Sequence, residues 1–110
     1  MPAVKALAAQ GVRKGDPVLL MLGNQVELWD CMLAVMKLGA IIMPTTTAAG
    51  PTDLIDRIAR GGARFIVTNP DQTTKFDEVP GDYGRITIGD VAGWSDLRAA
   101  YLRPAEQTAH

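Results

Sequence analysis

The chain has 110 residues, of which 47% are hydrophobic, and 11 lysines and arginines against 12 acidic residues give a net charge of −1. This length and composition fit one globular domain, and the near-neutral charge argues against nucleic acid or an anionic membrane as the main partner. One cysteine excludes an intrachain disulfide, and the apolar stretches are too short to span a membrane, so we expect a soluble protein of the cytoplasm.

The first part of the chain alternates between helical and extended patterns. Residues 2–10 have a helix-forming composition. Residues 17–22 (PVLLML) form a continuous apolar run, which is typical of a parallel strand covered on both faces. Residues 23–39 predict a second helix, in which Asn24 caps the start and Glu27 reaches back to the cap. Because apolar residues occur nearly all round this helix, we expect it to be buried.

The middle of the chain continues this alternation. A short apolar strand is expected at 40–44, where Pro44 ends it. An amphipathic helix is predicted over 50–62, because Pro51 suits its first turn and two glycines end it. Residues 64–69 (RFIVTN) then read as the next buried strand.

The last part of the chain has weaker patterns. The polar segment after residue 69 predicts one helical turn around Thr73–Asp77. Residues 85–89 predict a fourth strand. A short helix is expected at 94–102 with Ser95 as its cap, followed by a flexible C-terminal tail at 104–110.

Helices and short buried strands that alternate in this way predict an α/β fold with a mostly parallel, doubly wound sheet. Apolar side chains of the second helix should lie between helix and sheet, and those of the strands should lie in the sheet itself. The positions expected to be buried are Met32, Val35, Met36, Ile41, Ile42, Ile66 and Val67.

Ligands of such sheets bind beyond the carboxyl ends of the strands, and Thr45, Thr46 and Thr47 follow the second strand there. Hydroxyls, a glycine and a proline in this segment suggest a phosphate-binding loop. The segment lacks the several glycines and the lysine that such loops need, and the nearest downstream cation, Arg57, lies inside the next helix. We therefore expect these threonines to satisfy backbone groups of a turn.

Other chemistry-bearing residues also favour structural roles. Cys31 lies within the helix expected to be buried, which favours a core role over a nucleophilic one. The only histidine, His110, is terminal, so the sequence offers no set of metal ligands and no Ser–His–Asp triad. The adjacent acids 77–78 are typical of a solvated loop. Two roles remain open for Trp29 and Trp94: stacking on a ligand, or packing in the core or an interface. Packing is the commoner role of tryptophan. We assign no catalytic, cofactor-binding or metal-binding residue.

Three motifs, taken in order, carry a resemblance to a known family. The turn and strand G-[VL]-x-x-G-D-x-V is present as GVRKGDPV at 11–18, E-[LF]-W occupies 27–29, and K-x-G-A-x-x-x-P occupies 37–44. In this order and spacing, the chain resembles the N-terminal part of the AMP-forming acyl-CoA synthetases of the adenylate-forming superfamily. Within that family it is most similar to the medium-chain fatty acyl-CoA synthetases. The similarity runs from residue 4 to residue 103.

The resemblance implies that residues 1–103 are a partial AMP-binding N-terminal domain. Family members use ATP and Mg²⁺ to activate a fatty or other carboxylic acid as an acyl-adenylate, and then transfer the acyl group to coenzyme A. The family's phosphate loop, its adenine- and ribose-binding motifs and the catalytic lysine of its C-terminal domain have no counterpart here. No catalytic residue is therefore carried over, and this chain by itself is expected to bind no cofactor.

Two hypotheses from different classes remain. In the first, the chain is a fragment of an acyl-CoA synthetase and is inactive alone, with the remainder of the synthetase as its natural packing partner. A sheet edge and part of the apolar helix at 26–38 would then be uncovered, and the chain should self-associate. In the second, the chain is a stand-alone, non-catalytic α/β module that binds a partner or ligand, and it should be a closed monomer.

Overall fold

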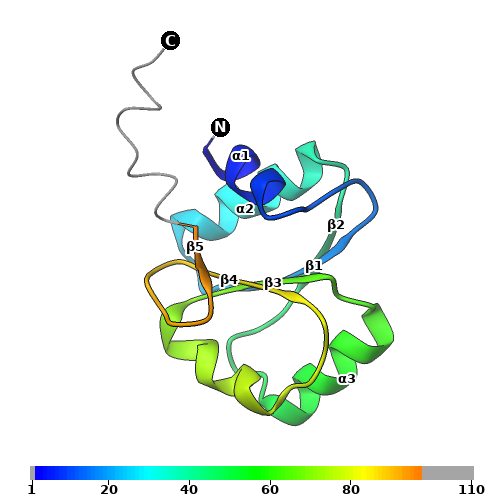
Figure 1. Cartoon of the computed structure of the whole chain (residues 1–110), viewed down its shortest axis with the longest axis vertical. Coiled ribbons are helices and arrows are strands. Elements are labelled where there is room, and N and C mark those ends of the chain that lie inside the picture. The colour runs from blue at the N-terminus through cyan, green and yellow to red at the C-terminus, as the bar shows by residue number, and fades with distance from the viewer. Residues whose placement is uncertain (1, 98–110) are drawn as a thin grey trace.

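Five parallel strands pair side by side in the order β2-β1-β3-β4-β5 (Figure 1). The structure, a computed structural model, describes residues 2–97. The helices are α1 (Pro2–Ala9), α2 (Val26–Lys37), α3 (Pro51–Gly61) and the 3-10 helix η1 (Pro70–Glu78). The strands are β1 (Pro17–Met21), β2 (Ile41–Pro44), β3 (Phe65–Thr68), β4 (Gly84–Thr87) and β5 (Ser95–Asp96).

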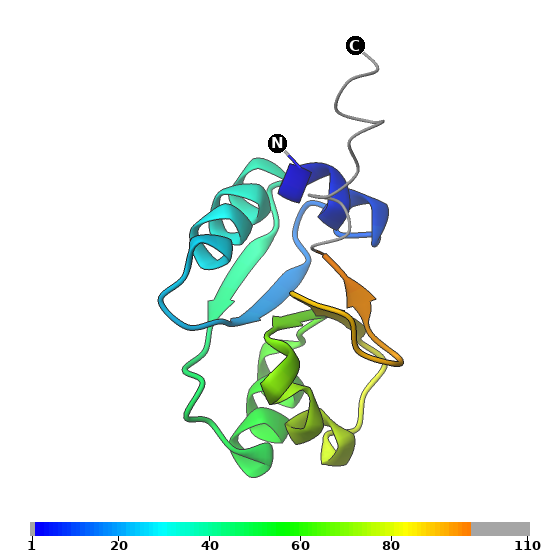
Figure 2. The same cartoon turned by 90° about the vertical axis from the view of Figure 1, so that its left-hand side faces the viewer.

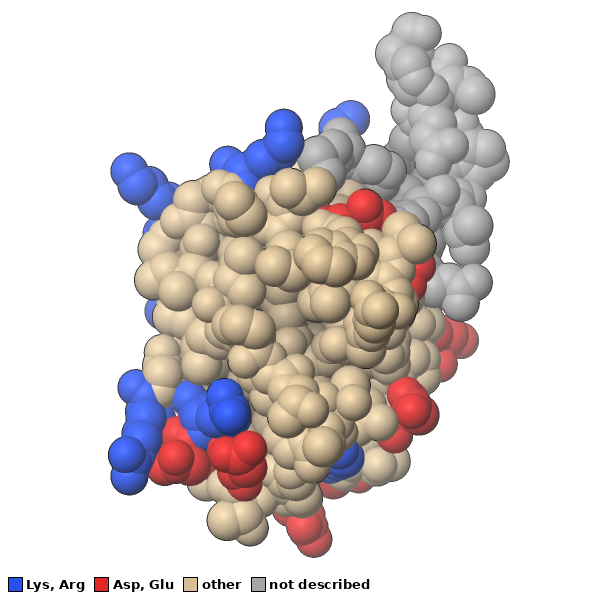
Figure 3. Space-filling view, turned by 180° about the vertical axis from the view of Figure 1, so that it is seen from behind, with Lys and Arg blue, Asp and Glu red and all other residues tan. Residues whose placement is uncertain are grey.

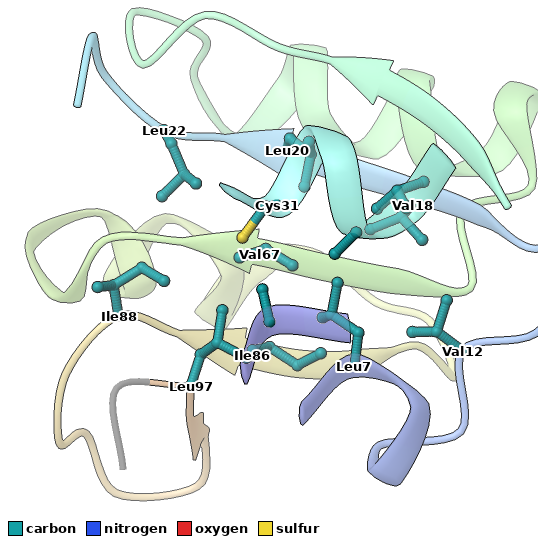
Figure 4. Close-up of a cluster of buried hydrophobic side chains, with 13 residues drawn as sticks. Leu7, Val12, Val18, Leu20, Leu22, Cys31, Val67, Ile86, Ile88 and Leu97 are labelled. Carbon is teal, nitrogen blue, oxygen red and sulfur yellow. The ribbon is translucent and has the colours of Figure 1, made fainter. Parts of the chain in front are cut away.

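Helices cover both faces of the sheet, so the predicted doubly wound α/β fold is confirmed. In Figure 1, α1 and α2 lie on one side of the strands and α3 lies on the other. Alternate residues of β1, an interior strand, enter two cores: Val18 and Leu20 pack toward α1 and α2, and Leu19 and Met21 pack toward α3 and η1. Figure 4 shows the first core, in which Cys31 of α2 lies over the sheet.

Burial in the sheet and on the inner side of α2 follows the prediction. Two predicted core residues are wrong: Met36 is 62% exposed and Ile41 is 52% exposed. Ile41 is exposed because β2 is an edge strand, with β1 as its only neighbour among the strands of residues 2–97. The confirmed positions are Val35, Ile66 and Val67, which are fully buried, with Met32 and Ile42 partly buried.

The expectation that α2 is buried nearly all round is wrong as well. Four apolar side chains on its outer side, Val26, Trp29, Leu33 and Met36, are exposed by 68%, 56%, 49% and 62%. We call these four residues the α2 face. The sheet and α1 cover only the inner side of α2, and no third layer of the described chain lies over the α2 face. Figure 2 shows α2 and β2 on the same side of the molecule.

Glycines follow the C-terminal ends of α2 and α3, and no side chain caps the start of α2. Gly39 and Gly62, which follow α2 and α3, have φ of 74° and 65°, the left-handed conformation that glycine adopts at low cost. The predicted capping box of Asn24 and Glu27 is wrong, because Gln25 is the N-cap residue of α2 and makes no side-chain cap bond. Instead, Glu27 accepts a hydrogen bond from the Gln25 side chain at 2.8 Å.

The segment after β3 is more helical than expected. The turn predicted around Thr73–Asp77 is part of the longer 3-10 helix Pro70–Glu78. Phe76 from this helix is fully buried and anchors the second core. The ring of Trp94 packs edge-on against Phe76 with 5.6 Å between ring centroids, so the packing role of Trp94 is confirmed.

The helix predicted at 94–102 is wrong where the structure describes it. Residues 95 and 96 form β5, which pairs in parallel with β4, and the Leu97 amide donates to the Thr87 carbonyl at 2.8 Å. The open edge of β4 offers backbone partners that the weak local helix propensity does not outweigh. The rest of the predicted helix and the tail at 104–110 lie outside the described residues.

Candidate functional site

The threonines after β2 are engaged with the main chain. Thr45 is buried, and its hydroxyl donates to the Met43 carbonyl at 3.3 Å. The Thr46 hydroxyl accepts from the amide of Ala48 at 3.2 Å. The carbonyl of Thr47 is itself occupied by a side-chain donor from η1. The expectation that these residues satisfy the backbone of a turn is confirmed for Thr45 and Thr46.

That side-chain donor is Lys75, a residue for which no sequence pattern predicted a role. Its Nζ atom donates to the carbonyls of Thr47 at 2.7 Å and Ala49 at 2.9 Å, so the ammonium fastens η1 to the loop after β2. Lys75 lies 28 residues beyond Thr47 in the chain. No local pattern indicates a contact over that distance. Arg57, the first cation after the threonines in the sequence, lies inside α3 as predicted, and the cation that binds this loop is Lys75.

An amide network joins the carboxyl ends of β1 and β3, which are neighbours in the sheet. Gln25 donates to the Asn69 side-chain oxygen at 3.0 Å, and Asn69 donates back to the Gln25 oxygen at 2.7 Å. The same Gln25 oxygen accepts from the amide of Gly23 at 3.1 Å, and the Gln25 nitrogen also donates to Glu27. These groups lie where ligands of parallel sheets bind, but they satisfy one another.

Two buried threonines lie side by side in β3 and β4. The Thr68 hydroxyl donates to the Met21 carbonyl at 2.8 Å. The Thr87 hydroxyl is fully buried and has no hydrogen-bond partner within residues 2–97. Beyond Thr87, the amide of Gly89 donates to the Asp96 carboxylate at 3.0 Å.

Cys31 is a core residue, as predicted. Its side chain is fully buried between α2 and the sheet. Burial, followed by the nearby carboxylates of Asp30 and Glu27, raises the pKa of the thiol to about 12. A nucleophilic cysteine requires the opposite shift and an accessible sulfur, so Cys31 is chemically inert in the folded chain.

The other candidates do not assemble into a site. Asp77 and Glu78 are exposed, as expected, and Trp29 is an exposed residue of the α2 face. His110 lies outside the described residues. Residues 2–97 contain no group of three His, Cys, Asp or Glu side chains arranged to hold a metal ion.

The loop after β2 does not fit a phosphate group. A phosphate loop presents free backbone amides and a free ammonium group to the anion. Here the Lys75 ammonium is bound to two carbonyls, and the amides of Thr45 and Ala49 donate to backbone carbonyls within the fold. We therefore assign no nucleotide-binding role to this loop.

The main surface feature is apolar. In Figure 3 a broad area without charged side chains is bordered by charged atoms, on the side of the molecule that carries α2 and β2. The α2 face supplies four of the six large hydrophobic side chains that are exposed in residues 2–97. No described helix is long and apolar enough to cross a membrane.

Comparison with known proteins gives consistent results. The family of AMP-binding enzymes matches residues 4–107. The mitochondrial acyl-coenzyme A synthetase ACSM2 of Rattus norvegicus is 34% identical over 97 residues, which cover 83% of this chain and 17% of that protein. The 4-coumarate–CoA ligase 5 of Oryza sativa subsp. japonica is 28% identical over 95 residues, which cover 86% of this chain and 17% of that protein.

Solved structures agree with the sequence matches. The crystal structure of Brucella canis acyl-CoA synthetase has a TM-score of 0.84 and 33% identity to this chain, with 90% of this chain and 19% of that chain covered. This chain thus spans less than a fifth of the length of these relatives. It belongs to the AMP-binding enzyme family, in which it corresponds to a short N-terminal portion of the acyl-CoA ligases.

Proposed function

We propose that this chain is a scaffold portion of the N-terminal domain of an AMP-forming acyl-CoA ligase. The observation that carries the proposal is the structural match of 90% of this chain to part of an acyl-CoA synthetase, with a TM-score of 0.84. In this proposal, residues 1–103 form the partial AMP-binding domain. The complete ligase uses ATP and Mg²⁺ to activate a carboxylic acid and then forms a thioester with coenzyme A.

The acid is proposed to be a fatty acid of medium length. Support comes from the E-L-W motif at 27–29 and from the similarity to a mitochondrial acyl-coenzyme A synthetase. A relative named as a 4-coumarate–CoA ligase makes aromatic acids the competing class. A complete ligase that carries this segment would decide between them in a comparison of octanoate with 4-coumarate as the substrate.

By itself the chain is proposed to be catalytically inactive. The groups that would bind phosphate are already engaged in the fold, since Lys75 donates to two carbonyls and the Thr45 hydroxyl donates to a third. Catalysis of adenylyl transfer depends on positioned charges that stabilise the transition state, and a scaffold does not supply them.

An activity assay tests this proposal. The purified chain is incubated with ATP, Mg²⁺, octanoate and coenzyme A, and pyrophosphate release is measured against a no-protein control. The full-length Brucella canis synthetase serves as the positive control. We expect release at the level of the no-protein control, and reproducible release above that level would refute the proposal.

A stand-alone, non-catalytic interaction module is the second candidate. One observation favours it: the exposed α2 face, with Trp29 and Met36 among its residues, is a surface that fits a macromolecular partner. The DNA downstream of the coding sequence discriminates between the two candidates. An in-frame phosphate-loop sequence there supports the ligase portion, and its absence from the locus supports the module.

We propose the cytoplasm as the location of the chain. The support is its single cysteine, which is unpaired and buried, as is usual in reducing compartments. Relatives named as mitochondrial proteins make the mitochondrial matrix the competing location. Imaging of the tagged chain beside a mitochondrial marker decides the question, and co-localisation with the marker would contradict the proposal.

A further inference from the structure

The α2 face has the geometry of a helix-pairing seam. At roughly 100° per residue, Val26, Trp29, Leu33 and Met36 fall within an arc of about 80°. Their spacing of three, four and three residues is that of alternating a and d positions in a heptad, the pattern by which two helices pack together. The fully buried residues of α2, such as Val35, lie on the opposite side of the helix. A seam of this kind is normally covered by another helix.

The charged side chains beside this seam face side chains of opposite charge when a second copy of the chain is placed by a twofold rotation. Asp30 and Lys37 lie seven residues apart on the same flank of the α2 face, and Leu33 lies between them. A twofold axis near Leu33 makes two copies of α2 antiparallel. Each Asp30 then lies opposite the partner copy's Lys37, and each Leu33 packs against its own counterpart. Two opposite charges placed in this way favour an isologous dimer.

The two ends of the helix add to this complementarity. In the antiparallel arrangement, the positive N-terminal end of one α2 dipole lies beside the negative C-terminal end of the other. Glu27 in the first turn and Lys37 in the last turn carry charges of the sign that each end favours. Figure 3 shows acidic atoms along the right border of the uncharged area, basic atoms at its upper left, and both kinds at its lower left.

We propose that the α2 face binds a second copy of this chain and forms a twofold-symmetric dimer through antiparallel α2 helices. One four-residue seam on a 12-residue helix is a small interface, so the dimer is weak, with a dissociation constant on the order of tens of micromolar. The proposal depends on the geometry of α2 and does not require the ligase assignment. The activity assay and the association experiment therefore succeed or fail independently.

Sedimentation velocity of the full chain tests the proposal. Between about 5 and 300 µM, a range chosen for a weak interface, we expect a reversible monomer–dimer equilibrium with no larger species. The variant Leu33→Asp should raise the dissociation constant at least tenfold, because it places a charge at the centre of the seam. The matched control is Ile55→Asp on α3, where the side chain is 39% exposed and lies outside the seam. Ile55→Asp should leave the dissociation constant unchanged.

Charge exchange tests the antiparallel geometry itself. Asp30→Lys and Lys37→Glu should each weaken self-association several-fold, because each places like charges opposite one another in the dimer. An equimolar mixture of these two variants should form heterodimers, since every cross-pair then joins a Lys to an acid. Arg57→Glu on α3 serves as the control and should have no effect. Circular dichroism melting confirms that each variant is folded.

Any one of the following results would overturn the proposal. The first is a monomer at every concentration, which would indicate that the α2 face packs against another part of a ligase chain and not against a second copy. The second is open-ended aggregation, or equal effects of Leu33→Asp and Ile55→Asp, which would mean that association does not use this seam. The third is a mixture of folded charge variants that associates no better than either variant alone.

Discussion

Gln25 and Asn69 exchange two side-chain hydrogen bonds, of 3.0 and 2.7 Å, although 44 residues separate them in the chain. Each amide uses both its donor and its acceptor toward the other. The pair closes the gap between the segments that follow β1 and β3. It therefore fixes the start of α2 relative to the sheet.

A double-mutant cycle measures this pair. Gln25→Ala and Asn69→Ala should each lower the free energy of unfolding by about 1–2 kcal/mol, because each leaves the partner amide unsatisfied. The double variant should cost less than the sum of the two by about 1 kcal/mol. Urea denaturation gives all four values. Strict additivity would show that the two amides do not support each other, and Gln10→Ala on the exposed surface is the neutral control.

The two sides of α2 should respond differently to the same charge. Val35→Asp buries a carboxylate without a partner and should cost several kcal/mol, about 3 or more. Met36→Asp, one residue further along, places the carboxylate on a side chain that is 62% exposed and should cost less than about 1 kcal/mol. Thermal melting at low protein concentration compares them. Equal losses would contradict the described orientation of the helix.

Thr68 and Thr87 allow a buried hydroxyl that has a hydrogen-bond partner to be compared with one that has none within residues 2–97. Thr87→Val removes a buried hydroxyl that has no partner within residues 2–97, so it should raise the free energy of unfolding by about 1 kcal/mol. Thr68→Val breaks the bond to the Met21 carbonyl and should lower it by about 1 kcal/mol. Both substitutions conserve shape, so packing changes little. Urea denaturation that gave the same sign for both would contradict this prediction.

Cys31 should make the folded chain less stable at high pH. Burial, with Asp30 and Glu27 as smaller causes, raises the pKa of its thiol from 9.0 to about 12. Between these values the unfolded chain releases the thiol proton and the folded chain keeps it. The free energy of unfolding should therefore fall as pH rises above 9, by up to about 1.4 kcal/mol per pH unit.

Comparison with Cys31→Ala isolates this effect, because the variant has no thiol to titrate. Burial also raises the pKa of Tyr83, which gives a loss of the same sign, but that loss is common to both proteins and cancels in their difference. Urea denaturation at pH 8 and at a pH between 9 and 10 is sufficient. Parallel pH profiles for the two proteins would show that the folded thiol ionises near its ordinary pKa.

The parts of the fold that were predicted correctly depend on nearest neighbours in the chain. The run at 17–22 is apolar at every position, and the glycine at 39 is the residue that a left-handed helix end needs, so both are readable locally. The fragment hypothesis predicted that part of the helix at 26–38 is uncovered, but it did not identify the four residues of the α2 face, because hydrophobicity shows that a side chain favours burial and does not show whether anything covers it. β5 was missed because its cause is the open edge of β4.

The candidate site was less predictable than the fold. The turn role of Thr45 and Thr46 follows from their position after a strand, and the sequence indicated it. The two ammonium bonds of Lys75 and the Gln25–Asn69 pair join segments that are 26–44 residues apart. Such contacts exist only once the sheet has brought strand ends together, and a single sequence carries no periodic signal for them.

The position of β1 inside the sheet, between β2 and β3, also affects what the nascent chain exposes while it is being synthesised. β1 pairs with β2 and β3, both of which follow it, and the bond from Thr68 to Met21 spans 47 residues. At about 5–20 residues per second, roughly 2–9 s separate the synthesis of these two ends. Throughout that interval the segment PVLLM is apolar and has no strand on one side. Nascent chains at this stage are the form that should bind ribosome-associated chaperones most strongly, and release should coincide with the emergence of β3.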